Sequence, residues 1–110
     1  MIEVNEYVRT KNGLIGKVDS LYGMIENTIH LENQKWIDTK SIVKHSKQLI
    51  DLIEVGDYVN GHLVEEVRIS CFDSSIFVHE YAIELHENDI KTILTKEQFE
   101  ANCYKMEEEK

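Results

Sequence analysis

One short pattern occurs twice in this chain, about 50 residues apart, and it constrains the fold more than any other feature. A Tyr-Val pair at residues 7–8 precedes an Asn-Gly pair at 12–13, and Tyr-Val-Asn-Gly recurs without interruption at 58–61. Because Asn and Gly both tolerate positive φ, each copy predicts a tight β-hairpin. The repetition predicts an internal duplication of one small β unit.

Short alternating segments fill the rest of the first copy. Residues 2–10 alternate apolar and polar side chains, which indicates a strand, and the Asn-Gly turn joins it to a partner strand over 14–21. The remaining expected elements are a looser connection from Tyr22, strands over 28–32 and 35–37, a turn with one 3₁₀ turn over 38–41, and a closing strand over 42–45.

A linker and a second set of strands follow the first copy. Four apolar residues between Leu49 and Ile53 have helical spacing, and Ser46 can cap a helix, so we expect a short helix of about two turns buried between two sheets. The elements expected in the second copy are a hairpin arm over 63–70, a turn at 73–75, one long strand over 76–85, a turn at 87–89 and a strand over 90–94.

The last helix has a well-marked start at Thr95. Thr95 as N-cap and Gln98 three residues later form a capping box, and Leu94 and Phe99 flank the cap as a hydrophobic staple. The sequence leaves open whether residues 104–106 continue this helix or return as a strand.

These elements predict a mainly β fold with a minor α+β component: two tandem SH3-like small barrels joined by a short helix, with a C-terminal helix. The expected parts are a first β unit at 1–48, a linker helix at 49–56, a second β unit with the C-terminal helix at 57–106, and a disordered tail at 107–110. Each barrel alone has few residues to bury, so we expect packing through the linker helix to supply the missing burial.

Charge is distributed unevenly along the chain, whose formal net charge is −9. Residues 1–50 carry seven bases and six acids, whereas residues 51–110 carry five bases and fifteen acids. The acidic half is explained either by solubility or by docking on a basic surface of another macromolecule. Because the sequence has no long apolar run, no signal segment and only two cysteines, we expect a cytoplasmic protein that does not bind membranes.

No motif for catalysis or cofactor binding occurs in the sequence. The five glycines do not form a nucleotide-binding loop, and no G-x-S-x-G or paired C-x-x-C motif is present. His79 and His86 lie on one predicted strand at opposite parity, so they are expected to face opposite sides rather than share a metal. Nothing around Cys71 or Cys103 supports a thiol nucleophile. We therefore predict a protein that is not an enzyme and has no cofactor and no metal site.

Two sets of residues are candidate binding surfaces. The first is aromatic and basic, because rings beside lysines can stack on nucleobases and hold phosphates; alternatively, Trp36 is the core aromatic of the first barrel. Its residues are Tyr22, Lys35, Trp36 and Lys40, with Arg9 and Lys11 in the same repeat. The second is an acidic face on the outer side of one sheet, for which a solvated surface is the alternative. Its residues are Glu65, Glu66, Asp73, Glu80, Glu84, Glu87 and Asp89.

Three stretches resemble small phage- and prophage-encoded proteins of Gram-positive, clostridia-like bacteria. They are EYVRTKNGLIGKV at 6–18, IVKHSKQLIDLIEVGDYVNG at 42–61 and IKTILTKEQFEANCYKM at 90–106. The resemblance carries no catalytic motif, and it implies a phage setting inside a bacterial host cell. Short acidic phage proteins include anti-CRISPR proteins and other inhibitors of bacterial defence, which is an analogy of class.

The hypothesis from the sequence is a phage accessory protein that inhibits a defence system by docking its acidic face on a basic nucleic-acid-binding surface. The expected partner is a host protein such as a CRISPR effector or another defence nuclease. One alternative is a nucleic-acid-binding small-barrel module, which the net charge disfavours because phosphates repel it. Further alternatives are a sponge for a nucleotide immune signal and a phage assembly adaptor, and a homodimer stays open.

Overall fold

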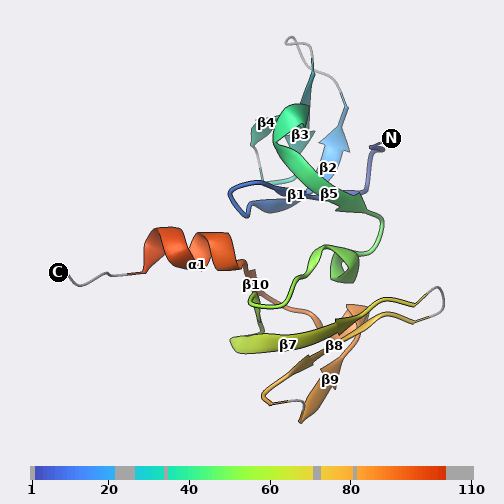
Figure 1. Cartoon of the computed structure of the whole chain (residues 1–110). Helices are drawn as coiled ribbons and strands as arrows, with labels where there is room; N and C mark the ends of the chain where they lie inside the picture. Colours follow the sequence, from blue (N-terminus) through green and yellow to red (C-terminus); the bar gives the residue numbers. More distant parts are fainter. Residues whose placement is uncertain (1, 22–26, 34, 71–72, 81, 104–110) are drawn as a thin grey trace, which may run out of the picture.

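The computed structural model describes residues 2–21, 27–33, 35–70, 73–80 and 82–103 of the chain. These residues form a mainly β protein with two five-stranded antiparallel sheets, one of them a half-barrel, and one short C-terminal helix. The two sheets form two lobes that follow each other along the chain (Figure 1). The first lobe is the sheet within residues 7–46, and the second lobe is the sheet within residues 58–94 together with the helix.

The first lobe contains the five strands that the sequence predicts for the first copy. They are β1 (Tyr7–Thr10), β2 (Ile15–Ser20), β3 (Thr28–Leu31), β4 (Trp36–Asp38) and β5 (Ile42–Ser46), in the order β4-β3-β2-β1-β5. The first strand begins at Tyr7 rather than at residue 2. The predicted 3₁₀ turn is η1 (Thr39–Ser41), and the Asp38 side chain accepts a hydrogen bond from the Lys40 backbone nitrogen, 2.9 Å away, at its start. The connection predicted from Tyr22 lies outside the described residues.

The second lobe repeats this topology. The linker between the lobes contains η2 (Leu49–Leu52). The elements of the second lobe are β6 (Tyr58–Val59), β7 (His62–Arg68), β8 (Ser75–Val78), β9 (Ile83–Leu85), η3 (Glu87–Asp89), β10 (Ile93–Leu94) and α1 (Lys96–Asn102). The strand order is β10-β6-β7-β8-β9, which matches the first lobe when each strand is replaced by its counterpart. A 3₁₀ helix precedes the last strand in both lobes. The predicted duplication is thus confirmed at the level of topology.

Each copy begins with the same turn, which holds a buried carboxylate. The sequence EVNEYV at residues 3–8 corresponds to EVGDYV at 54–59, a match that extends the predicted repeat. The carboxylates of Glu6 and Asp57 accept hydrogen bonds from the backbone nitrogens three residues earlier, at 3.4 and 2.8 Å respectively. The residue before each carboxylate has positive φ, 77° at Asn5 and 100° at Gly56. The repeat therefore includes the entrance to each sheet as well as its first hairpin.

The long strand predicted over residues 76–85 is wrong, because the chain folds back within it. β8 and β9 pair antiparallel as a hairpin. His79 and Glu80 turn the chain with φ values of 56° and 57°. Neither residue type is a strong turn signal, whereas folding back pairs β9 with β8 and lets Leu85 pack against the second core. The expectation that His79 and His86 face opposite sides of one strand is wrong for the same reason.

The linker is a single 3₁₀ turn, η2, rather than a helix of two turns. Gln48 is its N-cap residue, while Ser46 accepts a hydrogen bond from the Gln48 backbone nitrogen at 3.1 Å. Ile50 and Ile53 are buried in the core of the second lobe, and Leu52 is buried beside them in the chain. The predicted burial of the linker is confirmed, although its helix type differs.

Each lobe has its own small aliphatic core. The first core consists of Val8, Val18, Ile29 and Leu31. The second consists of Ile50, Ile53, Val59, Val64, Ile76 and Val78. The linker therefore supplies burial to the second lobe, which a small β unit needs because its own strands bury little apolar surface.

Helix α1 begins where the sequence predicts. Thr95 is its N-cap, and the Thr95 hydroxyl oxygen accepts a hydrogen bond from the backbone nitrogen of Gln98 at 3.3 Å. The Phe99 ring stacks on the Tyr58 ring with their centroids 5.3 Å apart, which holds the helix against β6. In the described part of the chain, no helix has the length and apolar character needed to cross a membrane.

Candidate functional site

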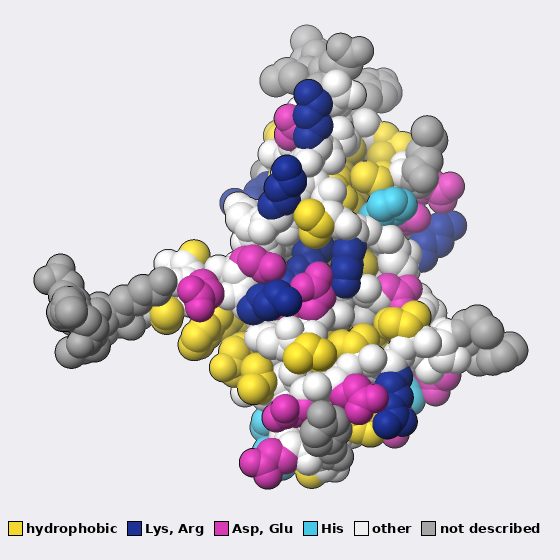
Figure 2. Space-filling view, in the orientation of Figure 1, with side chains coloured by type: hydrophobic (Ala, Val, Ile, Leu, Met, Phe, Trp, Pro, Cys, Tyr) yellow, Lys and Arg dark blue, Asp and Glu magenta, His cyan; other side chains and the backbone are white. Residues whose placement is uncertain are grey.

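The predicted acidic residues come from five places in the second lobe rather than from one strand. Glu65 and Glu66 lie on β7, Glu80 in the β8–β9 turn, Glu84 on β9, and Glu87 and Asp89 in η3, while Asp73 precedes β8. Asp73, Glu80, Glu84 and Asp89 are exposed, and the other three are half-buried. Figure 2 shows acidic side chains over the second lobe, below the junction of the lobes.

The outer face of the second sheet carries an aromatic ring between two carboxylates. Strand register places Glu66 opposite Phe77 and Phe77 opposite Glu84, across β7, β8 and β9. The guanidinium of Arg68 lies 4.7 Å from the Phe77 ring centroid, and its Nε donates a hydrogen bond to Glu66 at 2.7 Å. The neighbours of Phe77 on β8, Ile76 and Val78, point into the core. This face therefore offers an apolar centre with charged groups around it.

A histidine and three acids stand at the edge of this face. His86 Nδ1 lies 3.0 Å from an Asp73 oxygen, and His86 Nε2 lies 3.6 Å from a Glu84 oxygen. The hydrogen bond with Asp73, together with the charges of Asp73, Glu84 and Asp89, raises the pKa of His86 above its ordinary value. Protonation of His86 therefore offsets part of the acidic charge when the pH falls.

Glu87 caps the 3₁₀ turn of the linker, a role that the sequence did not reveal. Its two carboxylate oxygens accept hydrogen bonds from the backbone nitrogens of Leu49 and Ile50, at 3.0 and 2.8 Å. These nitrogens belong to the first turn of η2, where helical donors lack intrahelical partners. Glu87 thus caps the linker from the second lobe, and a change there alters the fold as well as the surface charge.

The aromatic and basic set is divided by the structure. Trp36 is 55% exposed, so the interpretation of Trp36 as the core aromatic of the first lobe is wrong. Pairing of Ile37 with Ile29, which is in the core, turns Trp36 outward on the edge strand β4. The His30 ring lies beside it with centroids 4.7 Å apart. Lys35 and Lys40 are exposed on the same lobe, whereas Tyr22 lies outside the described residues.

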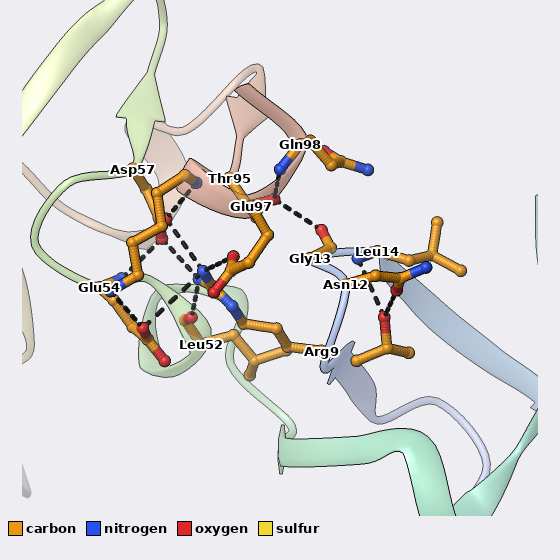
Figure 3. A network of polar contacts seen from close by, with 12 residues as sticks. Arg9, Asn12, Gly13, Leu14, Leu52, Glu54, Asp57, Thr95, Glu97 and Gln98 are labelled. Carbon is orange, nitrogen blue, oxygen red and sulfur yellow. Dashed lines mark hydrogen bonds and ion pairs between the residues drawn. The ribbon is translucent and has the colours of Figure 1, made fainter. Parts of the chain in front are cut away.

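Arg9 lies away from that surface, buried at the junction of the two lobes (Figure 3). Its two terminal nitrogens donate to the two Asp57 oxygens at 2.5 and 3.0 Å. They also donate to the Leu52 carbonyl at 2.9 Å and to Glu97 at 2.7 Å. The side chains of Arg9 and Asp57 are 1% and 0% exposed. A charge pair this buried is stable only when its remaining donors and acceptors are satisfied, as they are here.

Glu54 forms the exposed side of the same network. It accepts from Lys44 and Lys96 at 3.1 and 2.9 Å, and Arg9 lies 3.8 Å away. Burial alone would raise the pKa of Glu54, but the hydrogen bonds from both lysines and the charge of Arg9 outweigh it and lower the pKa to about 2. Glu54 therefore stays ionised and links a first-lobe lysine to a second-lobe lysine.

Sequence reasoning missed this junction because its partners are far apart in the chain. Arg9 was grouped with surface lysines, although its neighbour Val8 points into the core and Arg9 therefore points to the opposite face. The available signal was the EVNEYV and EVGDYV repeat, which marks Glu6 and Asp57 as equivalent acids. It does not reveal that an arginine from the first copy meets the acid of the second.

Comparisons with protein-family models, with curated proteins and with solved structures found no match. Within the described residues, no group of three or more histidine, cysteine or acidic side chains is arranged to hold a metal ion. Cys103 is a half-buried free thiol, and Cys71 lies outside the described residues.

The described surface also has an apolar hollow of about 310 Å³ beside α1. Tyr58, Leu94 and Phe99 line it, so the two residues of the predicted staple lie at one hollow.

Proposed function

We propose that this chain is a non-enzymatic binding protein whose acidic second lobe docks on a basic, nucleic-acid-binding surface of another protein. The observation that carries the proposal is the separation of charge between two copies of one unit. Residues 51–110 carry fifteen acids against five bases, whereas residues 1–50 are nearly balanced. We infer further that each lobe is an SH3-like unit, which the shared order of five short antiparallel strands with a 3₁₀ turn before the last strand supports.

The outer face of the second sheet has the composition that such docking needs. Phe77 supplies an aromatic contact, and Glu66 and Glu84 beside it can accept hydrogen bonds from arginine and lysine side chains. Carboxylates on this face would take the place of phosphate oxygens on the partner. The protein and a nucleic acid would then compete for the same surface of the partner. The affinity of the protein for its partner would fall as the salt concentration rises.

The proposed partner is a bacterial defence nuclease, such as a CRISPR effector, which makes the protein an inhibitor of bacterial defence. This part of the proposal relies on the resemblance of three stretches to phage-encoded proteins and on the short, acidic chain.

The test begins with capture of the partner by the tagged protein from nuclease-treated host lysate at low and at high salt. The captured protein is then purified and titrated with this chain in the presence and absence of its nucleic acid. We expect capture at low salt only and direct competition with the nucleic acid. A partner that holds the chain and its nucleic acid together would overturn the proposal.

Matched charge reversals locate the docking face. The double variant Glu80→Lys, Glu84→Lys changes two exposed residues of the second lobe, and Glu3→Lys, Glu32→Lys changes two exposed residues outside it. Both variants change the net charge equally. We expect the first to weaken binding about tenfold or more and the second to leave it nearly unchanged, because only the first meets the partner. Equal effects of both variants would refute docking through the second lobe.

Exposed Trp36 supports a second candidate function, binding of single-stranded nucleic acid by the first lobe. An aromatic ring on an edge strand can stack on a base, and Lys35 and Lys40 can neutralise phosphates. Trp36 is the one tryptophan of the chain, so its fluorescence reports on this surface directly. Quenching by an oligonucleotide, lost in Lys35→Glu, would favour this function, and unchanged fluorescence at saturating oligonucleotide would exclude it.

A further inference from the structure

The face of the first sheet that points toward the second lobe has two rows of residues, which differ in what they contact. Strand pairing places Ile15, Arg9 and Lys44 in one row and Lys17, Tyr7 and Ser46 in the next. The first row is closed by the ion pairs of Arg9 and Lys44 with second-lobe and linker acids. Tyr7 and Lys17 of the second row, together with Ile15 of the first, border an open cleft of about 370 Å³ between the lobes. The lobes are thus joined at Arg9 and Lys44 and separated beside Tyr7 and Lys17.

The cleft has a mixed lining drawn from both lobes. Apolar side chains, including Ile15, Leu49 and Ile93, form much of its wall. Tyr7 contributes an aromatic ring, and the Lys17 amino group lies 5.8 Å from the centroid of that ring. The second lobe contributes Lys91. Clefts at domain junctions that combine apolar walls with a few polar groups are the usual setting of small-molecule sites.

The charge of the cleft contrasts with that of the whole molecule. The chain is acidic, with a net charge of −9, and the neighbouring junction lysines Lys44 and Lys96 are both paired with Glu54. Among the interactions of the described residues, Lys17 and Lys91 have no carboxylate within ion-pair distance. One acid, Glu32, lines the cleft together with Asn33. Two lysines and one acid leave the cleft with an excess positive charge.

We propose that this cleft binds a small aromatic anion of mononucleotide size, held between the two lobes. The planar base would contact Tyr7 and the apolar wall, while the phosphate would lie between Lys17 and Lys91. The side-chain oxygens of Glu32 and Asn33 can accept hydrogen bonds from sugar hydroxyls or base amino groups, which favours a nucleotide over a simple aromatic acid. This site is separate from the acidic docking face. Its second-lobe residues lie on β10 or just before it, whereas Glu66, Phe77 and Glu84 lie on β7, β8 and β9.

The test uses the full chain and isothermal titration with adenosine 5′-monophosphate, guanosine 5′-monophosphate, adenosine and inorganic phosphate. We expect at least one nucleotide to bind, with adenosine and inorganic phosphate each about tenfold weaker or worse, since each lacks one half of the recognised structure. Absence of binding by both nucleotides up to millimolar concentration would overturn the proposal. Equal binding of inorganic phosphate and the nucleotides would also overturn it.

Matched variants assign the binding to the cleft. Lys17→Gln and Lys91→Gln are each expected to weaken nucleotide binding about tenfold, the scale of one charge-assisted hydrogen bond. Lys47→Gln, which changes an exposed lysine between β5 and η2, is expected to have no effect. Tyr7→Phe keeps the ring and should bind normally, while Tyr7→Leu should bind more weakly. Thermal unfolding of each variant shows whether it is folded. If Lys47→Gln and Lys91→Gln bind equally well, the site lies elsewhere and the proposal fails.

Discussion

Arg9 of the first lobe and Asp57 of the second form a buried, two-pronged ion pair, with nitrogen–oxygen distances of 2.5 and 3.0 Å. Asp57 is the counterpart of Glu6 in the duplicated turn, but the two acids have different partners. Glu6 contacts His45 within its own lobe at 2.8 Å, whereas Asp57 is met by an arginine from the other copy. The duplication is therefore asymmetric at this position, and the asymmetric ion pair joins the two similar units.

Loss of Asp57 should strongly destabilise the fold. Asp57→Ala leaves the Arg9 charge buried with only the half-buried carboxylates of Glu97 and Glu54 beside it. It also removes the acceptor of the Lys96 and Glu54 backbone nitrogens. We expect the free energy of unfolding to fall by about 3–5 kcal/mol, the usual cost of leaving a buried charge unpaired. Urea unfolding followed by circular dichroism measures this change.

A surface pair provides the control for that measurement. Glu3 and Lys47 form an ion pair at 3.3 Å with both side chains well exposed. Glu3→Ala should therefore cost less than about 1 kcal/mol. The double variant Arg9→Met, Asp57→Leu should recover part of the loss, because no fully buried charge remains without a partner. If Asp57→Ala unfolds at the same urea concentration as Glu3→Ala, the junction does not hold the lobes together.

Glu54 should make the fold sensitive to acid. Its pKa is lowered from 4.5 to about 2 in the folded protein, so it binds its proton more weakly when folded than when unfolded. Its stabilising contribution is fully present above about pH 4.5 and is lost as the pH falls towards 2. Urea midpoints measured across this range should decline less steeply for Glu54→Gln than for the natural chain. Parallel profiles would show that Glu54 does not contribute.

Local signals in the sequence predicted the local structure well. The Asn-Gly turns, the 3₁₀ turn after Asp38 and the Thr95 cap each depend on residues within a few positions of one another, and each is present. The predictions that failed concern residues whose conformation depends on pairing with segments farther along the chain. Trp36 faces outward because of its pairing register with β3. The turn at His79 forms because it allows β9 to pair with β8.

The candidate sites were less predictable than the fold for the same physical reason. Acidic composition indicated which half of the chain is negative, but it did not show that Glu87 serves as a cap. Alternation placed Arg9 opposite Val8, but only the packing of two lobes makes that opposite face an interior. The cleft at Tyr7 needed the same packing, because its wall is shared between segments far apart in sequence.

Substitution of Gly13 should destabilise the fold more than substitution of Gly61, although both glycines have positive φ, 87° and 84°. A Cβ at Gly13 would collide with the Thr95 hydroxyl, which donates a hydrogen bond to the Gly13 carbonyl at 2.8 Å across the junction. A Cβ at Gly61 meets no atom within 4 Å. Gly61→Ala should cost about 1 kcal/mol through backbone strain alone, and Gly13→Ala clearly more. Thermal unfolding compares the two, and equal losses would show that the junction yields to accommodate the methyl group.

Glu87 and Glu80 should respond differently to charge reversal, even though both belong to the predicted acidic face. Glu87→Lys removes the acceptor for the first two backbone nitrogens of η2, so its unfolding free energy should fall by about 1 kcal/mol or more. Glu80→Lys changes an exposed residue in the β8–β9 turn and should leave stability within about 0.5 kcal/mol. Chemical unfolding distinguishes the two variants. A stable Glu87→Lys would show that η2 does not need this cap, and Glu87 would then serve binding as Glu84 is proposed to do.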